Sequence, residues 1–246
     1  MHTRMERPLD LHAAGRVSGY GQRWSRGVAR LTLFAVVAVV SACDGPMGGD
    51  ASHQINSSVH VAAGAPPGSA ATVNGSIVID DNAAITSAAT VNGSIHLGAH
   101  ATAESLKSVN GEITLDAAAH VAHSAESVNG ALTLRDQAEV LGALANVNGS
   151  IELANAHVAG GIRTVMGSIT IMGDSRVEGG ILVKKPSGIS ISTNTGVPRI
   201  VIGPGAKVQG DLRFEREVRL YVSDRATVGP VTGAAPVTFA GDTPPA

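Results

Sequence analysis

A short pattern of alternating apolar and polar positions recurs along most of this chain. Each copy begins with Val-Asn-Gly and continues as an alternating run of the type Ser-Ile-x-Ile. From residue 138 onward, a second alternating run of the type Ala-x-Val-x-Gly-x-Ile recurs as well. Alternation with a period of two is typical of β-strands that bury one face, because successive side chains point to opposite sides. The pattern therefore predicts two short strands per copy, separated by corners that contain glycine or asparagine.

The copies are almost evenly spaced. Val-Asn-Gly begins at Val73, Val91, Val109, Val128 and Val147, and a degenerate Val-Met-Gly begins at Val165. The steps between them are 18, 18, 19, 19 and 18 residues. Eighteen residues also equal five turns of an α-helix, but the fixed glycines and the many β-branched residues oppose a helix. The repeat predicts one small unit stacked on copies of itself.

One coil of this length cannot bury its own apolar edge, so we expect the coils to stack as rungs about 4.8 Å apart. Stacking predicts an apolar ladder of Ile77, Ile95, Ile113, Leu132, Ile151 and Ile169. It also predicts a ladder of amides at one corner, made of Asn74, Asn92, Asn110, Asn129 and Asn148. Asparagine and glycine both tolerate positive φ, which suits them to that corner.

The repeats define the fold and the domain bounds. Ile55-Asn56-Ser57-Ser58 matches the pattern 18 residues before Val73, so we expect the array to occupy residues 55–231. The predicted fold class is all-β, a single-stranded parallel β-helix (β-solenoid) of about ten coils of roughly 18 residues. Residues 232–246 do not continue the repeat and are expected to be a disordered tail.

The register becomes irregular after Lys184. Ile189 with Ile191 and Ile200 with Ile202 each have the spacing of a further rung. The step from Ile189 to Ile200 is only 11 residues, which predicts one shortened coil.

The N-terminus follows a different pattern. Leu31 to Val40 is an uncharged apolar run of ten residues, preceded by Arg23, Arg26 and Arg30. At 1.5 Å per residue this run is too short to cross a hydrocarbon core of about 30 Å. A basic stretch, a short apolar stretch and then small residues are typical of a secretory signal.

Val40-Ser41-Ala42-Cys43 resembles the lipobox of bacterial lipoproteins. The resemblance implies that residues 1–42 are a signal peptide and that Cys43 is acylated as the first residue of the mature chain. Residues 43–54 would then be a lipidated N-terminus and short linker. The chain would be anchored in the bacterial cell envelope, on the periplasmic side of the inner membrane or in the outer membrane. The alternative is a free or buried cysteine behind an ordinary signal peptide.

Charge is unevenly distributed and argues against nucleic acid as a partner. Residues 43–160 hold two basic and eleven acidic residues, a net of −9, whereas residues 161–246 hold ten basic and seven acidic residues, a net of +3. A protein that binds a duplex needs a basic face to displace counterions from phosphate, and none is evident. Aromatic residues make up only 2%, which suits a narrow interior filled by small β-branched side chains.

The stretch from Ile200 to Leu212, IVIGPGAKVQGDL, resembles the signature of the bactofilins, a polymer-forming cytoskeletal family. That resemblance implies a right-handed, three-sided β-helix that polymerises end to end without nucleotide. The Val-Asn-Gly coils are also similar to an adhesin-type family of bacterial solenoid domains. This chain departs from typical bactofilins in its export signal, since they mostly act in the cytoplasm.

The candidates for chemistry are few. The closest histidines, His120 and His123, lie three residues apart and so point to opposite faces of a strand, which disfavours a shared metal. Asp80, Asp81 and Asp116 fall at a corner, where we expect solvated carboxylates. No phosphate-binding loop or nucleophile motif is present in the sequence. We therefore expect no enzyme activity, no cofactor, no metal and no small-molecule substrate.

Two functions remain. The first is a structural scaffold, a rigid rod tethered to a membrane through acyl chains on Cys43, which associates with copies of itself as a homo-oligomer or filament. The alternative is an adhesin-like module that binds a surface polymer or an envelope partner. The outward positions of the first run share no single chemistry, which favours the scaffold; they are Val78, His96, Thr114, Thr133, Glu152 and Thr170.

Overall fold

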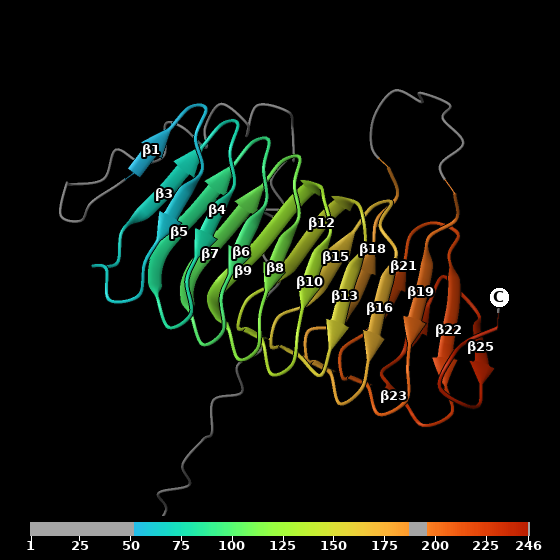
Figure 1. The fold of residues 1–246 in the computed structure, drawn as a ribbon. Coiled ribbons are helices and arrows are strands. Elements are labelled where there is room, and N and C mark those ends of the chain that lie inside the picture. The colour runs from blue at the N-terminus through green and yellow to red at the C-terminus, as the bar shows by residue number, and fades with distance from the viewer. Residues whose placement is uncertain (1–51, 187–195, 246) are drawn as a thin grey trace, which may run out of the picture. The chain divides into compact units, whose positions relative to one another are not determined.

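A computed structural model describes residues 52–186 and 196–245, with only the backbone of residues 52–54. The described residues contain 25 strands and no helix. Every strand pairing is parallel, and successive coils stack on one another as a β-solenoid of about nine turns (Figure 1). The prediction of an all-β parallel β-helix is confirmed.

One side of the solenoid is a ten-stranded sheet to which each coil contributes one short strand. In order, its strands are β2 (Val59–Val61), β4 (Ile77–Ile79), β6 (Ile95–Leu97), β8 (Ile113–Leu115), β10 (Leu132–Leu134), β13 (Ile151–Ala154), β16 (Ile169–Met172), β19 (Arg199–Ile202), β22 (Arg219–Ser223) and β25 (Pro236–Phe239). These strands correspond to the Ser-Ile-x-Ile run of the repeat.

The remaining strands form a fifteen-stranded sheet. The early coils contribute one strand each: β1 (Ser52–Gln54), β3 (Ser69–Thr72), β5 (Ala84–Thr90), β7 (Thr102–Ser108) and β9 (His120–Asn129). Each later coil contributes two shorter strands. The first of each pair are β11 (Glu139–Val140), β14 (His157–Val158), β17 (Arg176–Val177), β20 (Lys207–Val208) and β23 (Thr227–Val228). The second are β12 (Leu144–Asn148), β15 (Ile162–Thr164), β18 (Ile181–Val183), β21 (Leu212–Phe214) and β24 (Val231–Thr232).

A recurring glycine lies at the break between the paired strands. A Cβ on Gly142 would collide with the carbonyl oxygen of His123 in the preceding coil. Gly160, in the next coil, has the same close approach to the carbonyl of Gly142. Glycine therefore lets consecutive coils touch at this added corner, where any side chain would push them apart.

The core is a stack of apolar side chains in register. Ile77, Ile95, Ile113, Leu132, Ile151 and Ile169 lie opposite one another from strand to strand, and each is fully buried. Ile200 and Leu220 extend the same column. Burying such a side chain contributes about 1.5–3 kcal/mol. All buried core residues lie between Val59 and Phe239, so residues 44–246 contain the complete core of the solenoid.

The solenoid begins and ends outside the expected bounds. At its start, β1 pairs with β3, so the backbone stack reaches back to Ser52. At its end, the segment expected to be a disordered tail contains β25, which pairs with β22. Phe239 in β25 is buried, and Asp242 forms an ion pair with Arg225. The expectation of a disordered tail is therefore wrong for residues 232–245.

The irregular coil is enlarged rather than shortened. Ile169 pairs directly with Ile200, 31 residues later, whereas each preceding coil of this sheet takes 18 or 19 residues. The extra residues lie between the end of β18 at Val183 and the start of β19 at Arg199. Ile189 and Ile191 lie outside the described residues, and the pairing of β16 with β19 leaves no place for a rung between them.

Glycine is needed at the Asn-Gly corner for a different physical reason from the one expected. Positive φ occurs in the other corner, at Asn82, His100, Ala118, Gln137 and Asn155, with values of 51–61°. Among the Val-Asn-Gly copies only Gly149 has positive φ, at 126°, and in the other copies glycine is required by close contact. A Cβ on Gly93 would collide with the carbonyl oxygen of Gly75, and the same holds for each following copy.

Candidate functional site

The asparagines of the repeat form a chain of side-chain hydrogen bonds along one corner. The amide nitrogen of each donates to the amide oxygen of the asparagine one coil earlier, over 2.8–3.0 Å, from Asn129 through Asn110, Asn92 and Asn74 to Asn56. Asn148 is in backbone register with Asn129, but no side-chain hydrogen bond joins the two in the described structure. The bonded ladder thus begins one coil earlier than expected, at Asn56, and ends one coil sooner, at Asn129.

A second polar ladder lies inside the same corner and was missed in the sequence. A buried polar side chain lies two residues before each of these repeat asparagines and donates a hydrogen bond to a backbone carbonyl in the preceding coil. These side chains are Thr72, Thr90, Ser108, Ser127 and Asn146. Their spacing matches that of Val-Asn-Gly, and this was the available signal. Asn146 donates to the Gly130 carbonyl, but its amide oxygen is buried without a hydrogen-bond partner among the described residues.

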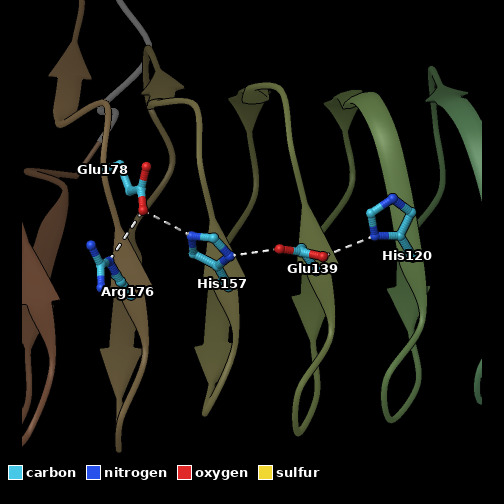
Figure 2. Close-up of polar contacts among 5 residues, drawn as sticks. All are labelled: His120, Glu139, His157, Arg176 and Glu178. Atoms are coloured by element: carbon cyan, nitrogen blue, oxygen red, sulfur yellow. Dashed lines mark hydrogen bonds and ion pairs between the residues drawn. The ribbon is translucent and has the colours of Figure 1, made fainter.

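Charged and imidazole side chains form a third column on the outer face of the fifteen-stranded sheet. Register places His120, Glu139, His157, Arg176 and Lys207 directly opposite one another in five successive coils. Figure 2 shows the first four of these side chains in a row across neighbouring strands, with Glu178 beside them. We call the five residues drawn in Figure 2 the histidine–carboxylate column.

The contacts in this column run without a break from coil to coil. The Glu139 carboxylate lies between two imidazoles, 3.0 Å from His120 Nδ1 and 2.8 Å from His157 Nδ1. The Nε2 atom of His157 lies 3.3 Å from a Glu178 oxygen, which also contacts Arg176 Nε at 3.2 Å. Each of these side chains is about one-third to one-half exposed, so water screens the interactions.

The column affects the ionisation of its central carboxylate. The hydrogen bond with His157 has the largest effect and lowers the pKa of Glu139 below its ordinary value of 4.5. Burial has the next largest effect and opposes it, and the hydrogen bond with His120 lowers the pKa further. His157 faces a carboxylate at each ring nitrogen, and only the imidazolium can donate from both nitrogens. Chemically, the column can tie coils together and respond to pH.

A smaller set of pairs lies on the ten-stranded sheet. His96 Nε2 is 2.9 Å from Asp116, which also accepts a 2.7 Å hydrogen bond from Arg135 in the next coil. His60 pairs with Asp80 in the same manner. His60, His96, His120 and His157 are thus each bonded to a carboxylate in a neighbouring coil. Thr114, expected to face solvent, is only 9% exposed and donates to Glu112.

These polar sets adjoin two shallow hollows rather than an enclosed chamber. One hollow is lined by Ala63, Val78, Ile79, Asp80, Asp81, His96 and Gly98. The other is lined by Gln137, Asn155, Ala156, His157, Asp174, Arg176 and Glu178. Within residues 52–186 and 196–245, no group of three or more histidine, cysteine or acidic side chains is arranged to hold a metal ion.

The two ends of the solenoid expose strand edges. β25 pairs with β22 along one edge, and its other edge has no strand partner in the described part of the chain. At the opposite end, β1 and β2 likewise each pair along one edge only in the described part of the chain. Phe239 accepts a hydrogen bond from Asp224, so by the alternation along a parallel strand the N–H of Thr238 points away from β22.

The proposed lipidation residue, Cys43, lies outside the described residues. Among the residues that are described, no helix is long and apolar enough to cross a membrane. No protein-family model matches the chain, and searches of curated proteins and of solved structures also give no match. The fold and its polar columns are therefore interpreted from their own geometry.

Proposed function

We propose that the protein is a structural element of the bacterial cell envelope, a β-solenoid rod tethered by acyl chains on Cys43 and joined end to end with further copies. The observation that carries this proposal is that, in the part of the chain that the structure describes, the strand edges at both ends of an all-parallel stack have no partner. Unpaired N–H and C=O groups on such an edge recruit further strands unless they are blocked.

The geometry of the stack favours one mode of association. Because all the described pairings are parallel, a second copy can dock its first rung on the last rung of the first copy and continue the same pairing. Residues 43–160, with a net charge of −9, and residues 161–246, with a net charge of +3, give the two parts of the chain opposite net charge. A head-to-tail contact does not close on itself, so it generates filaments.

Edge capping is incomplete at the C-terminal end. Pro236 supplies no N–H, and by the same alternation as Thr238 its position faces away from β22. The N–H of Thr238 remains as a free donor on that edge. Removing this one donor should therefore weaken the proposed contact between ends.

Thr238→Pro removes this free donor without removing a hydrogen bond to β22, and it should abolish or strongly reduce assembly. Sedimentation velocity of residues 44–246 at low salt, across a range of concentrations, measures the effect. Thr238→Val keeps the N–H and should assemble like the wild type. A wild-type domain that stays monomeric at high concentration and low salt, or a Thr238→Pro domain that assembles normally, would contradict the proposal.

A further inference from the structure

Seven cations gather where the last coils pass from the fifteen-stranded to the ten-stranded sheet. They are Arg163, Lys184, Lys185, Arg199, Arg213, Arg216 and Arg219, and we call them the basic corner. Arg163, Lys185, Arg199, Arg213 and Arg219 are exposed, and Lys184 and Arg216 are partly buried.

Strand register brings these side chains together. Arg163 and Arg213 flank Leu182 in one outward column. Arg199 pairs directly with Arg219 on neighbouring strands of the ten-stranded sheet. The seven cations therefore occupy three consecutive coils at one corner of the stack.

The basic corner replaces the amide ladder of the earlier coils. The N–H of Met166 bonds the carbonyl of Val147, which puts Met166 in line with Asn148. The N–H of Lys184 bonds Thr164, and the N–H of Glu215 bonds Val183. Continuing this register, Lys185 and Arg216 occupy the asparagine position in the next two coils.

Most of this charge has no counter-ion within residues 52–186 and 196–245. Among the described residues, the only ion pair that involves the basic corner joins Arg213 to Glu215 at 3.3 Å. Arg199 packs over the ring of Tyr221 and donates to the carbonyl of Pro245, and Arg216 donates to the carbonyl of Val165. Like charges directly opposed across two strands, as in the pair Arg199 and Arg219, destabilise a sheet. An external anion would relieve that repulsion.

The form of the basic corner indicates what kind of anion it meets. The cations lie at a corner of the solenoid, and none of them lines either of the two hollows described above. Exposed lysines and arginines on long stems suit a broad anionic surface better than a small ligand, which needs a concave site. A lipid bilayer with anionic headgroups is such a surface, and juxtamembrane basic clusters bind it.

We propose that the basic corner binds the anionic headgroups of a lipid bilayer, so that the rod contacts the membrane near its C-terminal end as well as at its N-terminal tether. The inference goes beyond the proposed function and relies on it only for the membrane setting. Residues 44–246 carry a net charge of −6, so binding to an anionic surface has to be local to this corner.

The test uses residues 44–246, which contain the whole core and lack Cys43, so its result does not depend on acylation. Vesicles of phosphatidylcholine alone are compared with vesicles that also contain phosphatidylglycerol, and the bound fraction is measured by co-sedimentation. We expect binding only to the anionic vesicles, with loss of binding as salt rises from about 0.1 M to about 1 M.

Two triple variants with the same change in net charge locate the site. Arg163→Gln/Lys185→Gln/Arg219→Gln should lower the partition coefficient about 100-fold, since each basic residue near an anionic surface contributes about five-fold. Lys107→Gln/Arg135→Gln/Lys207→Gln, outside the basic corner, should change it only slightly. Circular dichroism and thermal melting confirm that both variants fold.

Three results would overturn the proposal. The first is equal binding to neutral and anionic vesicles, and the second is an equal loss of binding in the two triple variants. The third is tighter binding to polygalacturonate than to anionic vesicles, which would assign the basic corner to an anionic polysaccharide. Self-assembly measured with Thr238→Pro is a separate readout, so a negative vesicle result leaves the rod proposal intact.

Discussion

At the scale of single residues, the corner beside the repeat asparagines shows how one substitution disturbs a repeating array. Thr72, Thr90, Ser108 and Ser127 each place a hydroxyl against a carbonyl oxygen of the preceding coil. Asn146 makes the same bond with its amide nitrogen but buries an amide oxygen that has no partner among the described residues. A buried, unpaired acceptor costs about 1–3 kcal/mol.

Asn146→Thr should therefore stabilise the solenoid by about 1 kcal/mol, because threonine keeps the donor and removes the unpaired oxygen. The measurement is the midpoint of denaturant unfolding at constant slope. The reciprocal change Thr90→Asn should lower the midpoint. If Asn146→Thr lowers the midpoint instead, the amide oxygen has a role that the hydrogen-bond pattern does not reveal.

At the scale of strands, some outward side chains of opposite charge link neighbouring coils. Glu139 is the best example, since it accepts hydrogen bonds from histidines in the coils before and after it. Its lowered pKa means that the folded state stabilises the ionised form of Glu139 relative to the unfolded chain. That stabilisation is complete above the ordinary pKa of 4.5 and is lost as pH falls through the lower, folded-state pKa.

Glu139→Gln should therefore destabilise the solenoid near neutral pH and have progressively less effect below pH 4.5. The loss should stay under about 1 kcal/mol, because the groups are partly exposed and screened. Unfolding midpoints of the two proteins between about pH 6 and about pH 3 give the difference. Glu152→Gln is the control, since Glu152 forms no ion pair in the described structure, and its effect should not depend on pH in this way.

The strands also show what the sequence could and could not predict. The column from Ile77 to Ile169 was predictable because every coil repeats the same position. The pairing of His120, Glu139 and His157 was not seen, since it appears only when residues 18 or 19 apart are compared across coils. β25 was missed because Pro236–Phe239 is a single short run with no Val-Asn-Gly before it. The sequence predicted a rung at Ile189 and Ile191 from alternation alone, and alternation does not show which earlier strand Ile200 pairs with, which is Ile169 in β16.

At the scale of the whole molecule, the proposal combines a tether, a rod and open ends. The tether rests on Val40-Ser41-Ala42-Cys43. Cys43→Ser should leave an unprocessed precursor or release the protein from membranes, because acylation and cleavage at that position both require the thiol. Membrane fractionation and the mobility of the chain on a gel measure this outcome. A Cys43→Ser protein that fractionates and migrates like the wild type would rule out the anchor.

The central claim is that the stack continues from one molecule into the next. Negative-stain electron microscopy of residues 44–246 at low salt tests it most directly. The account predicts unbranched filaments one solenoid wide, many times longer than the single rod of about 43 Å expected from nine turns at about 4.8 Å. Isolated short rods at every concentration and salt would contradict it.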